Sequence, residues 1–223
     1  MLSEIFKLFW KTVERKDARR INSQTPPTEI EQFCDIQYID DGLWHHRLDV
    51  YSKSGKLSHR PVIIDIHGGG WMYGTKEINK NYCLVLAQND YVVVNINYRL
   101  APDFSVADQL RDCFFAFKWV STNIEKYGGD LNNVFVTGDS AGGFLAAYSA
   151  LLNSSEKLRK IFGVTESGLE FRACGLTSPV CFMNTHTFQD VYYSRVKGKE
   201  FSESTLRGFC LLYTSPSPRD RSV

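Results

Sequence analysis

The sequence lacks several features that mark large classes of protein. No apolar run approaches the roughly 20 residues that a helix needs to cross a bilayer, which excludes an integral membrane protein. Lys and Arg total 26 against 25 Asp and Glu in 223 residues, so no excess of positive charge predicts a nucleic-acid-binding surface. None of the six cysteines forms a C-x-x-C pair, so zinc-ribbon and thioredoxin-like sites lack their ligand spacing.

The N-terminus also lacks the unbroken apolar stretch and the small-residue cleavage site of a secretory signal. Together with cysteines scattered through apolar segments, which are typical of buried free thiols, this predicts a cytoplasmic protein. An amphipathic helix over residues 1–20 fits the N-terminus better. Its apolar face carries Leu2, Ile5, Phe9 and Val13. We expect this helix to pack on the domain, with a position at a membrane surface as the alternative.

Strand and helix patterns alternate through the rest of the chain. Two alternating segments, 34–39 and 44–51, flank Asp40-Asp41-Gly42 and predict a hairpin. Runs rich in β-branched residues then indicate strands buried on both faces, at 62–66, 91–96 and 133–136, with a further candidate at 171–176. Helical patterns separate them at 78–89, 105–127 and 141–152. This order predicts an α/β fold with a mostly parallel, doubly wound sheet and helices on both faces.

A buried strand runs directly into a G-x-S-x-G pattern at residues 138–142, and small helix-forming residues follow. This is the context of a nucleophile elbow, in which a strained turn lifts the serine hydroxyl above the sheet. We therefore predict Ser140 as a nucleophile, with Gly138, Asp139 and Gly142 in structural roles. The N–H of Ala141, at the start of the helix, is expected to point toward a developing oxyanion.

A second glycine-rich segment, His67-Gly68-Gly69-Gly70-Trp71, follows the strand predicted at 62–66. Consecutive glycines expose backbone N–H groups, which can stabilise an oxyanion. We expect donors from Gly68, Gly69 and Gly70, of which Gly69 and Gly70 are favoured, and a structural role for His67. A P-loop is not matched, because the Lys-Ser/Thr pair is missing.

Three motifs together carry a resemblance to a known family: His67 to Trp71, Asn97-Tyr98-Arg99-Leu100-Ala101-Pro102, and Gly138 to Gly143. They resemble the hormone-sensitive-lipase-like branch of the α/β-hydrolases, which includes carboxylesterases and acetyl esterases. The resemblance implies an α/β-hydrolase fold and serine-dependent hydrolysis of short-chain carboxylic esters, with no metal and no cofactor. It also implies that the N-terminal region, about residues 1–30, forms part of a lid over the acyl pocket.

The sequence shows no convincing general base or acid. The fold's order is Ser, then Asp or Glu, then His, with the last two far downstream of the serine. His186 is the only histidine after Ser140, and Asp190 follows it in the reversed order, so we expect both partners to lie beyond Val223. Residues 210–223 resemble a translated sequencing adapter. We therefore expect one incomplete domain over residues 1–209, without its last strands, and a non-native tail.

Several interpretations stay open. A non-catalytic small-molecule-binding protein of the same fold, an arylformamidase or a peptidase is an alternative to an esterase that acts on a small-molecule ester. The oligomeric state is not predicted. Five aromatic residues either wall a small acyl pocket or pack in the core: Phe6, Phe9, Trp10, Trp71 and Phe104.

Overall fold

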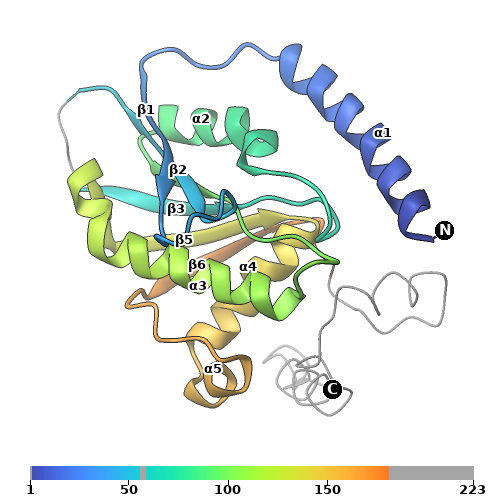
Figure 1. The fold of residues 1–223 in the computed structure, drawn as a ribbon. Helices are drawn as coiled ribbons and strands as arrows, with labels where there is room; N and C mark the ends of the chain where they lie inside the picture. Colours follow the sequence, from blue (N-terminus) through green and yellow to red (C-terminus); the bar gives the residue numbers. More distant parts are fainter. Residues whose placement is uncertain (1, 56–58, 181–223) are drawn as a thin grey trace, which may run out of the picture.

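The computed structural model describes residues 2–55 and 59–180, and a six-stranded sheet lies at their centre (Figure 1). The strands follow the order β1-β2-β4-β3-β5-β6. Their bounds are Ile30–Gln37 (β1), Arg47–Lys53 (β2), Arg60–Ile66 (β3), Val92–Ile96 (β4), Gly129–Asp139 (β5) and Phe171–Thr177 (β6). The pairs β1/β2 and β2/β4 are antiparallel, whereas β4, β3, β5 and β6 run parallel. The predicted hairpin and mostly parallel sheet are thus confirmed.

Helices cover both faces of this sheet, as predicted (Figure 1). The α-helices are α1 (Leu2–Asn22), α2 (Lys80–Gln88), α3 (Val106–Asn123), α4 (Ala141–Asn153) and α5 (Glu156–Phe162), and the short 3-10 helices are η1 (Lys76–Asn79) and η2 (Ile124–Tyr127). Helix α2 packs on one face, where Cys83, Leu84 and Ala87 meet Tyr51 and Val93 in a small core. The larger core lies on the opposite face, under α3 and α4.

Local chemistry explains where the helices begin. Ser105 opens α3 with a capping box: its side chain accepts from the N–H of Asp108, and the Asp108 carboxylate accepts from the N–H of Ser105. Ser155 caps α5 through the N–H of Leu158, and Gly163 ends that helix in the left-handed conformation. The sequence pattern does not predict α5, because its seven residues are too few to show a helical period.

Helix α1 confirms the predicted N-terminal helix but not every residue of its inward face. Trp10 stacks on Tyr73 with ring centroids 5.2 Å apart, and the hydroxyl of Tyr73 donates to Asp17 at 3.2 Å. Val13 is half-buried, but Phe9 is 56% exposed, so placing Phe9 on the packed face was wrong. The stripe that meets the body includes Trp10, one residue further along. Within residues 2–55 and 59–180, no helix is long and apolar enough to cross a bilayer.

Candidate active site

The turn between β5 and α4 has the geometry of a nucleophile elbow. Ser140 lies directly between them with φ 51° and ψ −115°, a strained backbone conformation for a residue other than glycine. Its N–H donates to Thr177 O at 2.9 Å, and its carbonyl accepts from Phe144 N at 3.1 Å and Val180 N at 3.2 Å. The surrounding backbone thus holds Ser140 in this conformation from the end of β6 and from the first turn of α4.

Close packing of main chain against main chain maintains this turn. A Cβ atom on Gly142 would lie 2.0 Å from Ile66 O, at the end of β3. Only glycine therefore allows α4 to begin so close to the neighbouring strand. This contact places the start of the helix beside the segment that leaves β3.

That segment is the glycine loop, which here means residues 67–71. Gly69 adopts φ 117°, and a Cβ atom there would lie 1.9 Å from Tyr73 O, so the turn requires a glycine. The N–H of Gly68 donates to Asp139 Oδ1 at 3.0 Å. Because Asp139 already uses this N–H, we do not retain Gly68 as an oxyanion donor. Gly69, Gly70 and Ala141 remain the proposed donors.

The loop that follows β4 holds the other end of the glycine loop. Trp71 O accepts from Ala101 N at 2.8 Å and from Gln109 Nε2 at 2.9 Å. Tyr98 stacks on His67 with centroids 4.3 Å apart, and its hydroxyl donates to His67 O at 2.8 Å. The glycine loop is therefore fixed at both ends, which is the preorganisation that oxyanion stabilisation requires.

His67 has the environment of a structural residue. It is fully buried, and this burial lowers the pKa of its imidazole to about 4, so the ring is neutral near pH 7. Nδ1 lies 2.7 Å from Gly68 O, which can only accept, so Nδ1 carries the proton. The ring thus packs inside the glycine loop, and a structural role for His67 stays a prediction.

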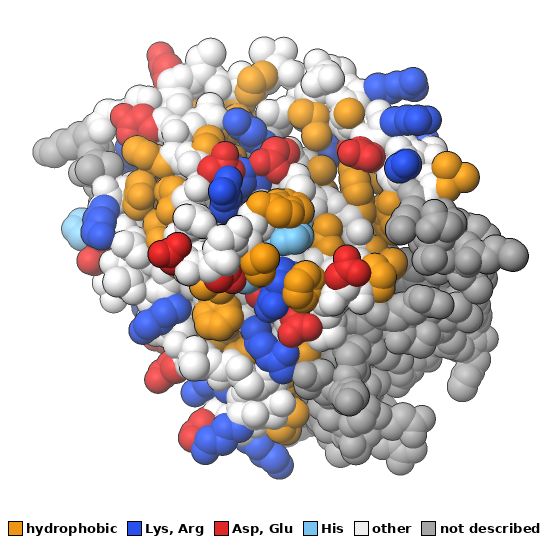
Figure 2. All heavy atoms as spheres, in the orientation of Figure 1, with side chains coloured by type: hydrophobic (Ala, Val, Ile, Leu, Met, Phe, Trp, Pro, Cys, Tyr) orange, Lys and Arg blue, Asp and Glu red, His pale blue; other side chains and the backbone are white. Residues whose placement is uncertain are grey.

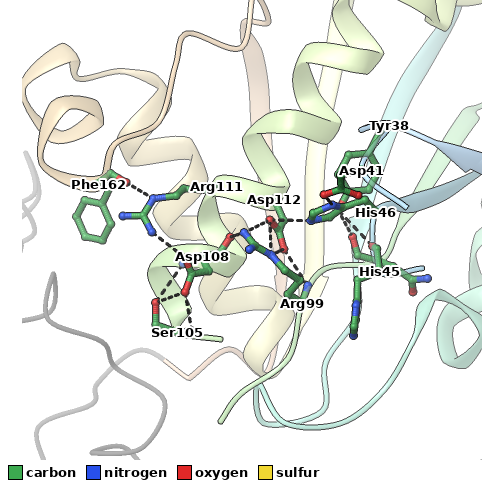
Figure 3. Close-up of polar contacts among 11 residues, drawn as sticks. Tyr38, Asp41, His45, His46, Arg99, Ser105, Asp108, Arg111, Asp112 and Phe162 are labelled. Carbon is green, nitrogen blue, oxygen red and sulfur yellow. Dashed lines mark hydrogen bonds and ion pairs between the residues drawn. The ribbon is translucent and has the colours of Figure 1, made fainter. Parts of the chain in front are cut away.

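A charged cluster anchors the loop after β4 to the rest of the domain (Figure 3). The Asp112 carboxylate on α3 is fully buried and accepts from Arg99 Nη2 at 2.6 Å and from Arg99 N at 2.9 Å. His46 lies between two carboxylates, with Nε2 3.2 Å from Asp112 Oδ1 and Nδ1 2.7 Å from Asp41 Oδ2. Burial lowers the pKa of His46, but the two carboxylates, Asp112 first, outweigh this effect, so the pKa is raised.

A cavity of about 380 Å³ lies between α1 and the chain that follows the glycine loop. Its lining includes Asp17, Ile21, Trp44, Met72, Tyr73 and Leu100. Of the predicted pocket aromatics, Trp71 is only 1% exposed and packs edge-on against Phe144 at 5.5 Å, so it belongs to the core.

The structure brings together the residues of the elbow and the glycine loop, through Asp139 with Gly68 and through Gly142 with Ile66. His186, Asp190 and the tail at 210–223 lie outside the described residues. Two further residues were not predicted: Asn79, whose side chain contacts Asp139, and Asp112, which holds Arg99. No motif marks either residue, because each acts through a partner that is distant in the sequence.

Comparisons with known proteins agree with this geometry. The BD-FAE family model matches residues 48–185, more than half of the chain. Esterase B from Lactobacillus rhamnosis, solved with a C4-C4 SN3 tributyrin phosphonate inhibitor, superposes with a TM-score of 0.84 at 31% identity, over 89% of this chain and 65% of that one.

Two curated relatives are also esterases by name. Carboxylesterase NlhH of Mycobacterium tuberculosis is 34% identical over 63% of this chain and 45% of its own length. The versiconal hemiacetal acetate esterase of Dothistroma septosporum is 36% identical over 50% of this chain and 33% of its own. The chain thus spans less than half the length of each.

The fold and the elbow define an α/β-hydrolase, of the hormone-sensitive-lipase-like esterase branch. The chain belongs to the BD-FAE family within that class.

Proposed function

We propose that the protein that carries this chain hydrolyses short-chain carboxylic esters through an acyl-serine intermediate. The single observation behind this proposal is the backbone of Ser140, at φ 51° and ψ −115° between β5 and α4, beside a glycine loop held at both ends. A strained turn of this kind serves to present a nucleophile above the sheet.

In the proposed reaction, Ser140 Oγ attacks the ester carbonyl while a base takes its proton. The carbonyl oxygen becomes an oxyanion and accepts from the N–H groups of Gly69 or Gly70 and of Ala141. Ala141 is the first residue of α4, so its N–H has no acceptor within the helix. The positive end of the helix dipole adds to this, and the first turn of α4 carries no acidic residue. The alcohol then leaves with a proton, and water hydrolyses the acyl-enzyme.

The base and its orienting acid remain a prediction for residues beyond those described. His46 and His67 do not suit the role, since the first is held between Asp41 and Asp112 and the second is buried against Gly68 O. The proposal includes neither metal nor cofactor.

Two observations support a small uncharged ester as the substrate class. The esterase B neighbour was solved with a phosphonate of tributyrin, whose acyl chains have four carbons. On the face shown in Figure 2, acidic and basic side chains are interspersed and apolar ones lie between them, so this face offers no single-sign patch for a polyanion. The cytoplasmic location stays a prediction.

Turnover of p-nitrophenyl acetate and butyrate tests the function, in residues 1–223 and in the uninterrupted gene product. In the uninterrupted gene product, Ser140→Ala is expected to lower kcat by at least about 10³-fold, because the residual rate comes from the oxyanion donors and binding alone. Ser154→Ala, at the exposed end of α4, is the matched control and should hydrolyse both esters like the parent protein. Near-normal turnover by Ser140→Ala, or faster turnover of long-chain than of short-chain esters, contradicts the proposal.

A further inference from the structure

Asn79, the last residue of η1, donates to two carboxylates at once. Its Nδ2 lies 2.9 Å from Asp65 Oδ2 on β3 and 2.9 Å from Asp139 Oδ1 at the end of β5. Asn79 is also the residue before α2, where an asparagine side chain commonly caps the helix, yet it makes no capping hydrogen bond. Both N–H bonds of its amide are therefore committed to the carboxylates.

The two carboxylates differ in how close they lie to Ser140, the predicted nucleophile. Asp139 directly precedes Ser140, and its Oδ1 also accepts from the N–H of Gly68. Asp65 lies deeper in β3 and is only 1% exposed. Through Asn79, the elbow, the glycine loop and β3 form one hydrogen-bonded unit. A cavity of about 120 Å³, whose lining also includes Tyr82 and Thr177, lies beside it.

The carboxyl groups of Asp65 and Asp139 need a hydrogen-bond donor that they can share. Burial raises the pKa of Asp65 to about 7, and the neighbouring Asp139 adds to this, while hydrogen bonds from Asn79 and Cys83 oppose it. Without the Asn79 amide, two carboxyl groups would face each other with no donor between them. Asp139 would then be free to turn away from Gly68.

We propose that Asn79 is a positioning residue of the ester-hydrolysing site, which aligns the glycine loop with Ser140 by holding the Asp139 carboxylate under the Gly68 N–H. This inference rests on the proposed function. It makes Asn79 and Asp65 part of the machinery although neither touches substrate.

Asn79→Asp tests this directly, because it keeps the size of the side chain and replaces its donor with an acceptor. We expect kcat for p-nitrophenyl butyrate to fall by about 10- to 100-fold in the uninterrupted gene product, with KM changed by less than about threefold, because a small displacement of the donors affects the transition state more than binding. Asn89→Asp, an exposed change just after α2, is the matched control and should keep the parent kcat.

Two readouts separate positioning from stability. The deficit of Asn79→Asp should shrink as the pH falls from about 8 to about 6, because protonating one of the three clustered carboxyls restores a donor. The double variant Asn79→Asp with Asp139→Asn should recover at least about 10-fold of the lost kcat. In that variant the amide introduced at position 139 can donate to the carboxylate introduced at position 79 and still accept from Gly68. A parent-like kcat in Asn79→Asp, or a loss that neither low pH nor the double variant relieves, overturns the proposal.

One readout does not depend on turnover. In residues 1–223, the Gly68 amide should exchange its hydrogen at least about 10-fold faster in Asn79→Asp than in Asn89→Asp, because its acceptor is displaced. Absence of any hydrolysis by the parent protein refutes the proposed function alone. The Gly68 exchange rate then decides the role of Asn79, and an unchanged rate overturns it.

Discussion

Two loops follow the strands on either side of β3, and different forces hold them. The elbow after β5 is held by close main-chain contacts, such as that of Gly142 with Ile66 O. The loop after β4 is held by charge, with Arg99 bonded to the buried carboxylate of Asp112 (Figure 3). Steric contacts fix the conformation of the backbone, which lets the elbow present the proposed nucleophile. Charge pairs fix which segments lie together, and the loop after β4 supports the glycine loop at Trp71.

A change in the loop after β4 should have the largest effect on stability. Arg99→Met removes the guanidinium and leaves the Asp112 carboxylate, which is fully buried, with His46 as its remaining ion-pair partner among the described residues. We expect the free energy of unfolding to fall by about 3–5 kcal/mol, as for other broken buried pairs. Urea denaturation measures this. Arg19→Met, on the exposed side of α1, is the control. Equal losses of unfolding free energy in the two variants would mean that charge does not hold the loop after β4.

The elbow should respond to a single methyl group. Gly142→Ala places a Cβ atom against Ile66 O, and overpacking of this kind costs about 1–3 kcal/mol. Gly42→Ala is a useful control, because its Cβ would meet nothing within 4 Å and only the backbone cost of φ 76° applies. Thermal unfolding and ester turnover should both separate the two variants. If Gly142→Ala keeps parent turnover, close packing does not define the elbow.

The stabilisation that His46 provides next to the loop after β4 should depend on pH in a definite direction. Since folding raises the pKa of His46, the stabilisation it provides is fully present below its unfolded pKa and is lost as the pH rises through the folded value. The Tm deficit of His46→Gln relative to the parent should therefore be larger at about pH 5.5 than at about pH 8. The elbow variant Gly142→Ala should show a nearly constant deficit over this range. A deficit for His46→Gln that grows with pH contradicts the assignment.

Helix α1 should give the smallest effect, since few side chains connect it to the body. Trp10→Ala removes the stack on Tyr73, worth about 1 kcal/mol. We expect faster hydrogen exchange within α1 and unchanged exchange in β5. Leu8→Ala, which alters a side chain that is 68% exposed, should leave both unchanged. Equal exchange in the two variants would mean that the stack does not hold α1.

The comparison also shows why part of the site could be predicted from the sequence. The close contacts of Gly142 and Gly69 leave no room for a side chain. The glycines in the sequence therefore already indicate where these contacts occur. Ser140 and Ala141 follow from the same local pattern, because a strand, a turn and a helix meet there within a few residues.

The supporting side chains could not be predicted in this way. Asp112 holds Arg99 from 13 residues away, and Asn79 reaches Asp139 across 60 residues. Such pairs depend on strand order and on helix placement, which a single sequence does not determine. Phe9 was misplaced for a related reason, since the helical period indicates a face but not which body that face meets.

The central claim is that Ser140 is the nucleophile, and its covalent modification tests this most directly. The uninterrupted gene product would be treated with a p-nitrophenyl alkylphosphonate, and the adduct would be located by peptide mass spectrometry. The account predicts one adduct, on the peptide containing Ser140, that forms in proportion to the loss of p-nitrophenyl butyrate hydrolysis. An adduct on another residue, or an unmodified Ser140 in protein whose hydrolysis has been abolished, would contradict it.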